Sequence, residues 1–310
     1  RQKRSFEAIV AAFLLTFHDF EQSDYNDSSL TGKLRTRARN AKAALQFLTG
    51  TKEGRLILLL HGPGGSGKST VINLVLAYAR EYCELLGHPF TIRTIVVTAM
   101  SGVAVTLIHG ETTHKAMAIN KDKGPDPDDI EAWHDTRLVI IDECSFASPG
   151  QVEQMERCAR VLKSQDYLYY GGLNIVFAGD FSQLEPPRAK PLYFEGKECP
   201  AFHGLLNGFI ELDGRHRFKD DPAYGEMMMR FRNGVPRDDD IKLLNDTCMI
   251  SEEHFPDPNV PVAVWRNSAR DAINAAMFEE YCKANKPEAD DDTTVFGGAT
   301  LVFMDNLEMR

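Results

Sequence analysis

A short glycine-rich segment restricts the possible folds of this chain more than any other feature. Residues 62–70 read Gly-Pro-Gly-Gly-Ser-Gly-Lys-Ser-Thr, after the apolar residues 56–61 and before a helix-prone stretch at 69–86. Glycines let the backbone turn its N–H groups inward around phosphate oxygens, and the dipole of the following helix favours an anion. The segment therefore predicts a phosphate-binding loop between a strand and a helix.

The side chains after the glycines extend this prediction to a nucleotide and its metal ion. Lys68 is expected to reach the β- and γ-phosphates, and the Ser69 hydroxyl is expected to bind Mg²⁺. A structural turn without nucleotide is the alternative, but such a turn needs neither side chain. MgATP is therefore the expected cofactor. The expected nucleotide-binding residues are Gly62, Gly64, Gly65, Ser66, Gly67, Lys68, Ser69 and Thr70.

Apolar strands and helical stretches alternate after residue 56, which predicts an α/β fold with a parallel sheet. We expect strands at 56–61, 94–98, 138–141 and 174–178, and helices at 69–86, from about 102, and at 151–163. Prolines between 186 and 200 interrupt the pattern. Three parts are predicted: a helical and loop segment at 1–50, a first ATPase domain at 51–204, and an incomplete second α/β domain at 205–310. The second domain is expected to contain strands at 209–212 and 262–265 and helices at 223–232, 238–246 and 268–283.

Bulk composition excludes several other classes of protein. With 43% hydrophobic residues in a chain of 310, disorder is not the main state, and a net charge of −10 limits any nucleic-acid contact to local basic patches. The six cysteines form no C-x-x-C pair, so neither zinc nor a disulfide framework is expected. Residues 6–20 repeat phenylalanine or isoleucine at helical spacing, which predicts a surface helix with one buried face rather than a secretion signal. The chain lacks an uncharged apolar run of about 18 residues, so no membrane span is expected.

Two carboxylates follow the third expected strand. In Leu138-Val-Ile-Ile-Asp142-Glu143, Asp142 is expected to hold Mg²⁺ through water, and Glu143 to orient or deprotonate the attacking water. Two exposed acids at the end of a strand are the structural alternative. A further segment, Gly179-Asp-Phe-Ser-Gln-Leu-Glu-Pro-Pro187, follows the fourth strand and places Gln183 where it can sense the γ-phosphate.

These three segments resemble motifs I, II and III of superfamily 1 helicases, and GDFSQLEPP is especially similar to the PIF branch. RecD-like helicases are close cousins. The resemblance implies RecA-like domains, movement from 5′ to 3′ and a single-stranded or forked DNA partner. It also implies that four residues are candidate DNA contacts. The alternative is that their segment is only a strand, a turn and a helix, with His114 a core or surface histidine whose hydrogen bonds are made within the protein. The four residues are Thr98, Gly102, Thr112 and His114.

The same resemblance implies an arginine finger in the segment Leu212-Asp-Gly-Arg215-His-Arg217-Phe218. Arg217 occupies the position of the finger, although Phe218 replaces the glutamine that the family has next. Arg215 therefore remains a second candidate. A solvated basic cluster, or a patch that contacts phosphates of the DNA backbone, is the structural alternative, as it is for the basic stretches at 33–42 and 230–237.

Two elements of the family pattern are not evident. No glutamine-bearing adenine motif precedes the phosphate loop, although the resemblance would place one in residues 33–48, and the late DNA-binding and nucleotide motifs are missing. We therefore expect a fragment of a helicase. The alternatives are a nucleic-acid-stimulated ATPase that changes conformation without unwinding, and a small-molecule kinase. The expected location is intracellular: nuclear or mitochondrial in a eukaryote, cytoplasmic in a bacterium or for a virus. Oligomeric state is not predicted.

Overall fold

The computed structural model describes residues 1–17, 40–47, 55–100, 102, 110–119, 124–194, 199–248, 262, 264 and 266–284. These residues belong to two compact units, Arg1–Arg237 and Asp238–Arg310. All six described strands lie in the first unit.

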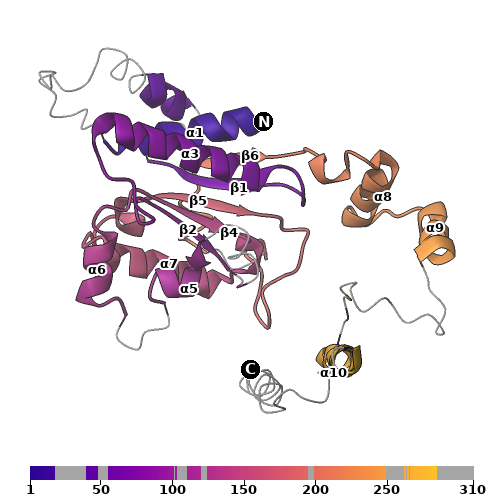
Figure 1. Ribbon diagram of the computed structural model, residues 1–310. Coiled ribbons are helices and arrows are strands. Elements are labelled where there is room, and N and C mark those ends of the chain that lie inside the picture. Colours follow the sequence, from indigo (N-terminus) through magenta and orange to yellow (C-terminus); the bar gives the residue numbers. More distant parts are fainter. Residues whose placement is uncertain are drawn as a thin grey trace, which may run out of the picture. The chain divides into compact units, whose positions relative to one another are not determined.

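The described strands form one parallel sheet in the order β3-β2-β4-β5-β1-β6 (Figure 1). Their bounds are Ile57–His61 for β1, Ile95–Ala99 for β2, Glu111–Thr112 for β3, Leu138–Asp142 for β4, Asn174–Gly179 for β5 and Gly208–Glu211 for β6. The central strands β1, β4 and β5 are apolar almost throughout, because helices cover both faces of the sheet. The expected parallel α/β fold is confirmed.

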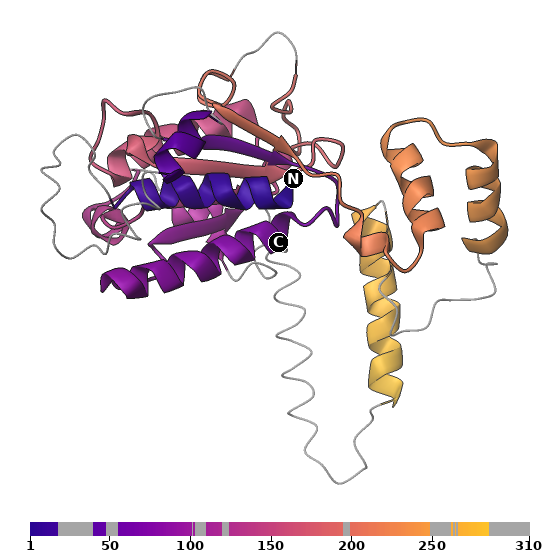
Figure 2. The ribbon, with the colours of Figure 1, turned by 90° about the horizontal axis from the view of Figure 1, so that it is seen from above.

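Helices α1 (Gln2–Leu15) and α3 (Lys68–Leu86) cover one face of the sheet and lie beside each other (Figures 1 and 2). Helices α5 (Thr113–Ala116), α6 (Pro127–Trp133) and α7 (Pro149–Leu162) cover the other face. Alternate strand residues face the two cores: Leu58 and Ile140 belong to the α1/α3 side, Leu59 and Ile141 to the α7 side. Short helices η1 (Cys144–Phe146), η2 (Tyr169–Gly172) and η3 (His216–Phe218), a helix at 40–47 and α8 (Pro222–Arg232) complete the first unit as described.

The first turns of α6 and α7 show why these helices begin where they do. Asp126 and Ser148 each accept a hydrogen bond from a backbone N–H of the first turn, and the side chains of Asp129 and Gln151 accept one from the backbone N–H of the cap. Proline follows each cap directly, where its missing N–H costs nothing. These local signals fix the start of α7 two residues before the predicted position.

Helix α1 differs from the predicted surface helix with one buried face. Residues 8–14 are all buried, because α1 packs against α3 and reaches β5, where the Asn174 side chain donates a hydrogen bond to Ala12 O at 3.4 Å. At the end of the helix, Arg137 donates to Thr16 O at 2.7 Å. The small residues Ala8, Ala11 and Ala12 permit this close approach, so the helix belongs to the interior. The rest of the expected helix, 18–20, lies outside the described residues.

The first unit also extends beyond the predicted boundary at residue 204. Strand β6 pairs in parallel with β1, with His61 opposite Glu211, so residues 208–211 complete the first sheet and do not begin a second one. Helix α8 belongs to the same unit. The second unit contributes α9 (Asp238–Cys248) and α10 (Asn267–Ala284). The strand expected at 262–265 falls partly outside the described residues. Within the described part, no helix is long and apolar enough to span a membrane.

Candidate nucleotide-hydrolysis site

The carboxyl ends of the parallel strands bring the predicted segments to one edge of the sheet. Strand β1 ends at His61, opposite Gly179 of β5, and β4 ends at Asp142. Gly62 N–H donates to Gly179 O at 3.1 Å, so the glycine-rich loop begins directly beside the predicted segment at residues 179–187. This edge is where open α/β sheets bind their ligands.

The loop at residues 62–67 joins β1 to α3 and closes on itself. Ser66 N–H donates to Pro63 O at 3.1 Å, and Gly67 takes the left-handed conformation, with φ 97°, as the N-cap of α3. This places the N–H groups of the first helical turn at the mouth of the loop. The Ser66 hydroxyl is buried without a hydrogen-bond partner among the described residues. A loop of this form, with an unsatisfied hydroxyl, fits a phosphate group.

Lys68 lies inside the loop and holds it in shape. Its Nζ donates to Gly62 O at 2.6 Å and to Pro63 O at 3.3 Å. Burial lowers the pKa of Lys68, against the charges of Asp142 and Glu143, which raise it. Ser69 and Thr70 are exposed at the start of α3, where their hydroxyls are accessible to a metal ion.

Asp142 and Glu143 stand at the end of β4 in two different environments. Asp142 is 7% exposed, accepts the Glu143 N–H at 2.9 Å, and has its pKa raised by burial against that hydrogen bond and the Lys68 charge. Burial also raises the pKa of Glu143, with the Asp142 charge adding to the effect. Glu143 takes a left-handed φ of 53°, and its buried Oε2 has no partner among the described residues. An unsatisfied carboxylate oxygen with a raised pKa suits a group that takes a proton from water.

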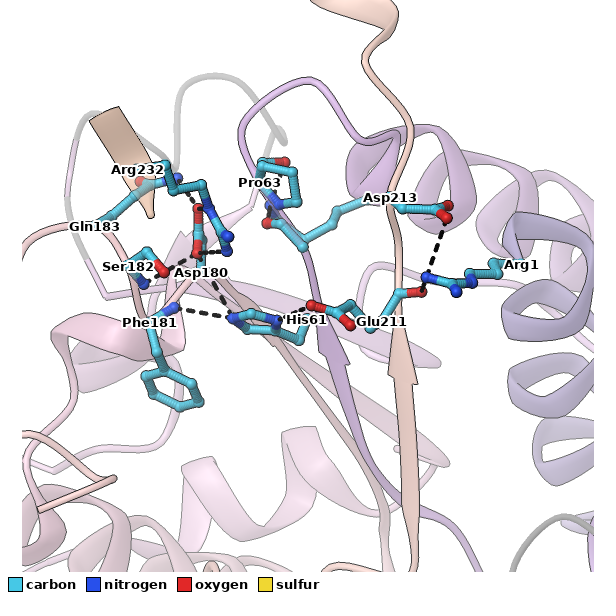
Figure 3. Close-up of polar contacts among 12 residues, drawn as sticks. Arg1, His61, Pro63, Asp180, Phe181, Ser182, Gln183, Glu211, Asp213 and Arg232 are labelled. Atoms are coloured by element: carbon cyan, nitrogen blue, oxygen red, sulfur yellow. Dashed lines mark hydrogen bonds and ion pairs between the residues drawn. The ribbon is translucent and has the colours of Figure 1, made fainter. Parts of the chain in front are cut away.

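Asp180, the first residue after β5, accepts hydrogen bonds from several neighbouring groups (Figure 3). It accepts hydrogen bonds from Ser182 N–H at 3.0 Å, from Gln183 Nε2 at 3.4 Å, and from Arg232 of α8 at 2.7 and 3.4 Å. His61 Nε2 lies 3.6 Å from Asp180 and accepts the Phe181 N–H at 3.3 Å. Gln183 thus lies beside the loop: a Cβ on Gly64 would be 4.0 Å from its Nε2.

The segment around η3 packs onto the glycine-rich loop. A Cβ on Gly64 would lie 3.1 Å from Arg217 Nη1, and one on Gly65 only 2.4 Å from Arg217 Cβ. Arg217 also lowers the pKa of Glu143, although the larger effects of burial and Asp142 raise it. Arg215 is exposed at the N-terminus of η3. Of the two finger candidates, Arg217 is the one against the loop, and it belongs to the first compact unit rather than to a second domain.

Two contacts of the loop have no counterpart among the sequence predictions. Gln2 of α1 donates from Nε2 to Ser66 O at 2.9 Å, and it lies so close that a Cβ on Gly67 would overlap its side chain. His216 N–H donates to Gly65 O at 3.0 Å, and its Nε2 is 3.1 Å from Gln2 Nε2. A glutamine does therefore reach the loop, from residue 2 rather than from 33–48. No local pattern in the sequence predicts this contact, because it depends on how α1 packs beside the loop.

The four expected DNA contacts have different environments. Thr98 is fully buried: its hydroxyl donates to Ile140 O at 3.2 Å and accepts from Thr113 at 3.0 Å. It supports the sheet from inside and no longer stands among the candidate DNA contacts. His114 Nε2 is satisfied by Gln151 Nε2 at 3.2 Å, and Thr112 caps α5. Gly102 is exposed, and a Cβ there would have no other described residue within 4 Å.

The described residues contain no group of three or more His, Cys, Asp or Glu side chains that could hold a metal ion by themselves. A metal at this edge would therefore need oxygen atoms from the nucleotide, which is how Mg²⁺ usually binds beside phosphates. Ser69 and Asp142 fit such a shared site in chemistry, with one hydroxyl and one carboxylate.

Comparisons with known proteins agree with this geometry. The chain is 32% identical over 148 residues to the ATP-dependent DNA helicase RRM3 of Saccharomyces cerevisiae, covering 44% of this chain and 19% of the relative. It is 26% identical over 215 residues to the ATP-dependent DNA helicase PIF1 of Candida albicans, covering 63% of this chain and 22% of the relative. The chain thus spans about a fifth of the length of these curated relatives.

Solved structures show the same fold. The crystal structure of Pif1 helicase from Candida albicans and that of Pif1 from Bacteroides with ADP-AlF3 and ssDNA each match 73% of this chain with a TM-score of 0.58. Identities are 22% and 21%, and the matches cover 51% and 54% of those chains. The family model of the PIF1-like helicases matches residues 39–192, which contain the glycine-rich loop, the paired carboxylates and the Asp180 segment. Through these residues, the chain belongs to the PIF1-like helicase family.

Proposed function

We propose that this chain is the ATP-hydrolysing part of a DNA helicase that moves from 5′ to 3′ on single-stranded DNA. The observation that carries the proposal is the convergence of five side chains on one loop at the carboxyl edge of the sheet. They come from four separate segments and are Lys68, Asp142, Glu143, Gln183 and Arg217. A structural turn needs none of them there.

Each group has a distinct part in the proposed reaction. Lys68, Ser69 and Asp142 would hold MgATP, and the nucleotide supplies the phosphoryl group that is transferred to water. Glu143 would orient a water molecule and take its proton, because its raised pKa makes the carboxylate a stronger base than a surface glutamate.

Gln183 and Arg217 would complete the site on the side facing the γ-phosphate. The Gln183 amide is a hydrogen-bond donor held by Asp180, and Arg217 is a permanent positive charge against the loop. An arginine at a transferring phosphoryl group stabilises the charge of the transition state and raises turnover by about a thousandfold or more. Both side chains are therefore expected to affect turnover more than nucleotide affinity.

The proposed partner is single-stranded or forked DNA, and coupled unwinding would require two RecA-like domains closing on ATP. The similarity to proteins named ATP-dependent DNA helicases supports this. Gly102, Thr112 and His114 lie on the segments after β2 and at β3, near the same sheet edge, and remain candidate DNA contacts. We propose an intracellular setting, which suits a DNA substrate and the described cysteines, none of which forms a disulfide.

The test is ATP hydrolysis by the chain extended through a second RecA-like domain, with and without single-stranded DNA, with Glu143→Gln in the same extended protein as the blank. Hydrolysis that rises with DNA and disappears in the blank supports the proposal. Nucleotide binding with hydrolysis that ignores DNA would overturn the helicase assignment. Strand displacement by the same extended protein, on substrates with 5′ or 3′ tails, then tests direction. Unwinding only from 3′ tails refutes the 5′-to-3′ proposal, and stimulated hydrolysis without strand separation favours the ATPase that changes conformation without unwinding.

A further inference from the structure

Helix α8 touches the site at a point that the proposed mechanism does not use. Arg232, its last residue, donates from Nη2 to Asp180 Oδ1 at 2.7 Å and from Nε to Oδ2 at 3.4 Å (Figure 3). The side chains of Arg232 and Asp180 are 19% and 3% exposed, so the ion pair is largely withdrawn from water. Two hydrogen bonds between one guanidinium and one carboxylate fix the relative orientation of the two groups as well as the distance between them.

Asp180 connects this arginine to Gln183, the proposed sensor of the γ-phosphate. The same carboxylate that binds Arg232 also accepts the Gln183 amide at 3.4 Å and the Ser182 N–H at 3.0 Å. Burial alone would raise the pKa of Asp180, but hydrogen bonds from Arg232, Ser182 and Gln183, together with the Arg232 charge, outweigh burial and lower it. Arg232 therefore contributes to the negative charge of the carboxylate that binds Gln183.

The other end of the same segment carries Arg217. The chain is closely packed between η3 and α8. The rings of Phe218 and Tyr224 meet edge-to-face, with their centroids 5.7 Å apart, and a Cβ on Gly225 would lie 2.7 Å from Phe218 Cβ. The Asp221 side chain caps α8 by accepting the Tyr224 N–H at 2.9 Å. Residues 216–232 therefore form one packed segment. This segment contacts the site at two places: Arg217 lies against the glycine-rich loop, and Arg232 binds Asp180.

We propose that Arg232 is a positioning residue. Its ion pair with Asp180 fixes the position of Gln183 relative to Arg217 beside the glycine-rich loop. This inference rests on the proposed function. It also assigns to Arg232 a role other than binding DNA phosphates, although the residue lies in the basic stretch 230–237. Two of its N–H donors are used by a buried carboxylate, and its side chain is 19% exposed, so Arg232 is poorly placed to bind a DNA backbone.

The test compares binding of MgADP with binding of MgADP plus aluminium fluoride, which mimics the transferring phosphoryl group. In Arg232→Met, the affinity for MgADP should stay within about threefold of the parent, while the preference for the fluoride complex should fall about tenfold or more. Hydrolysis should show a lower kcat at nearly unchanged KM. Arg232→Lys should recover part of the preference, because it restores the charge without the two-bond geometry.

A matched control separates positioning from general stability. Arg160 and Glu156 form a comparable pair on α7, at 2.6 Å with side chains 26% and 6% exposed, and neither contacts the phosphate loop. Arg160→Met should lower the unfolding temperature without changing the fluoride preference. Asp180→Asn should lose the preference as Arg232→Met does, and the double variant should lose no more than either single variant.

The outcomes are distinct. If the parent chain itself does not prefer the fluoride complex over MgADP, the proposed function fails and the inference fails with it. If the parent prefers it and Arg232→Met prefers it equally, only the inference is overturned. A loss of preference in Arg160→Met equal to that in Arg232→Met would also overturn it, because stability would then explain both.

Discussion

Gly65 offers the sharpest test of how the Arg217 segment sits on the phosphate loop. Its φ is 79°, and a Cβ there would be 2.4 Å from Arg217 Cβ and 3.1 Å from Arg217 N. Because one of these contacts is to backbone, rotation of the arginine side chain cannot relieve them. Gly65→Ala should therefore push residues 215–217 away from the loop.

The magnitude has two parts. A left-handed backbone costs an alanine about 1 kcal/mol, and forcing a carbon into an occupied site costs about 1–3 kcal/mol more. We expect a loss of about 2–4 kcal/mol in the free energy of unfolding for Gly65→Ala. Gly87, at the end of α3, provides a matched control: its φ is 69°, and a Cβ there meets no described residue within 4 Å. Gly87→Ala should lose only the backbone part, about 1 kcal/mol.

The assay is urea unfolding of both variants together with MgADP binding and ATP hydrolysis. Gly65→Ala should lose hydrolysis at least about tenfold beyond any loss in MgADP affinity, since Arg217 is expected to act on turnover. Gly87→Ala should keep both. Equal losses of stability in the two variants, or unchanged hydrolysis in Gly65→Ala, would refute the packing of Arg217 against the loop.

Three further predictions concern single side chains. Lys68→Ala should leave the chain folded by circular dichroism but weaken MgADP binding at least about tenfold in a fluorescence titration, because the loop loses its positive charge; unchanged affinity would contradict the role of Lys68. Burial raises the pKa of Asp142 above 3.8, so its carboxyl group stays protonated to higher pH in the folded chain than in the unfolded chain, and the free energy of unfolding falls as the pH rises from 3.8 through the folded-state pKa. Calorimetry without nucleotide should therefore show a smaller fall for Asp142→Asn, and a higher unfolding temperature than the parent at neutral pH. A lower unfolding temperature would contradict this direction. Trp133→Phe should cost about 1–3 kcal/mol, because the buried Trp133 Nε1 donates to Ala116 O at 3.1 Å and the carbonyl would lose its partner; MgADP affinity should not change, and a loss of affinity would show that α6 influences the site.

The sequence is informative wherever the signal is local. The apolar runs predict strands at 138–141 and 174–178, and the strands lie at Leu138–Asp142 and Asn174–Gly179, since such runs between turn residues suit central parallel strands. Glycine spacing predicts the tight turn between β1 and α3, because the residues that form this turn are adjacent in the sequence. Asp142 and Glu143 can be placed beside it because parallel strands end at one edge.

What the sequence does not predict depends on contacts between distant segments. The Arg232–Asp180 pair joins residues 52 positions apart, and the Gln2–Ser66 bond joins residues 64 apart. No periodicity or motif encodes such a contact, because it depends on how whole helices pack. The same limit applies to Thr98: the family resemblance makes it a candidate DNA contact, but a parallel sheet with both faces covered buries its side chain.

The strand order of the sheet has a consequence for how the chain is made. Strand β1, which leads into the glycine-rich loop, lies between β5 and β6. Leu56 N–H, just before the strand, donates to the Asn174 side chain 118 residues later, and Ile57 N–H donates to the Asn207 side chain 150 residues later. A ribosome adds about 5–20 residues per second, so β1 waits roughly six to thirty seconds for its neighbours. During that interval an apolar strand is exposed without partners. Synthesis of this domain therefore has a defined period in which a chaperone would protect it from aggregation, and that period ends only after β6 has left the ribosome.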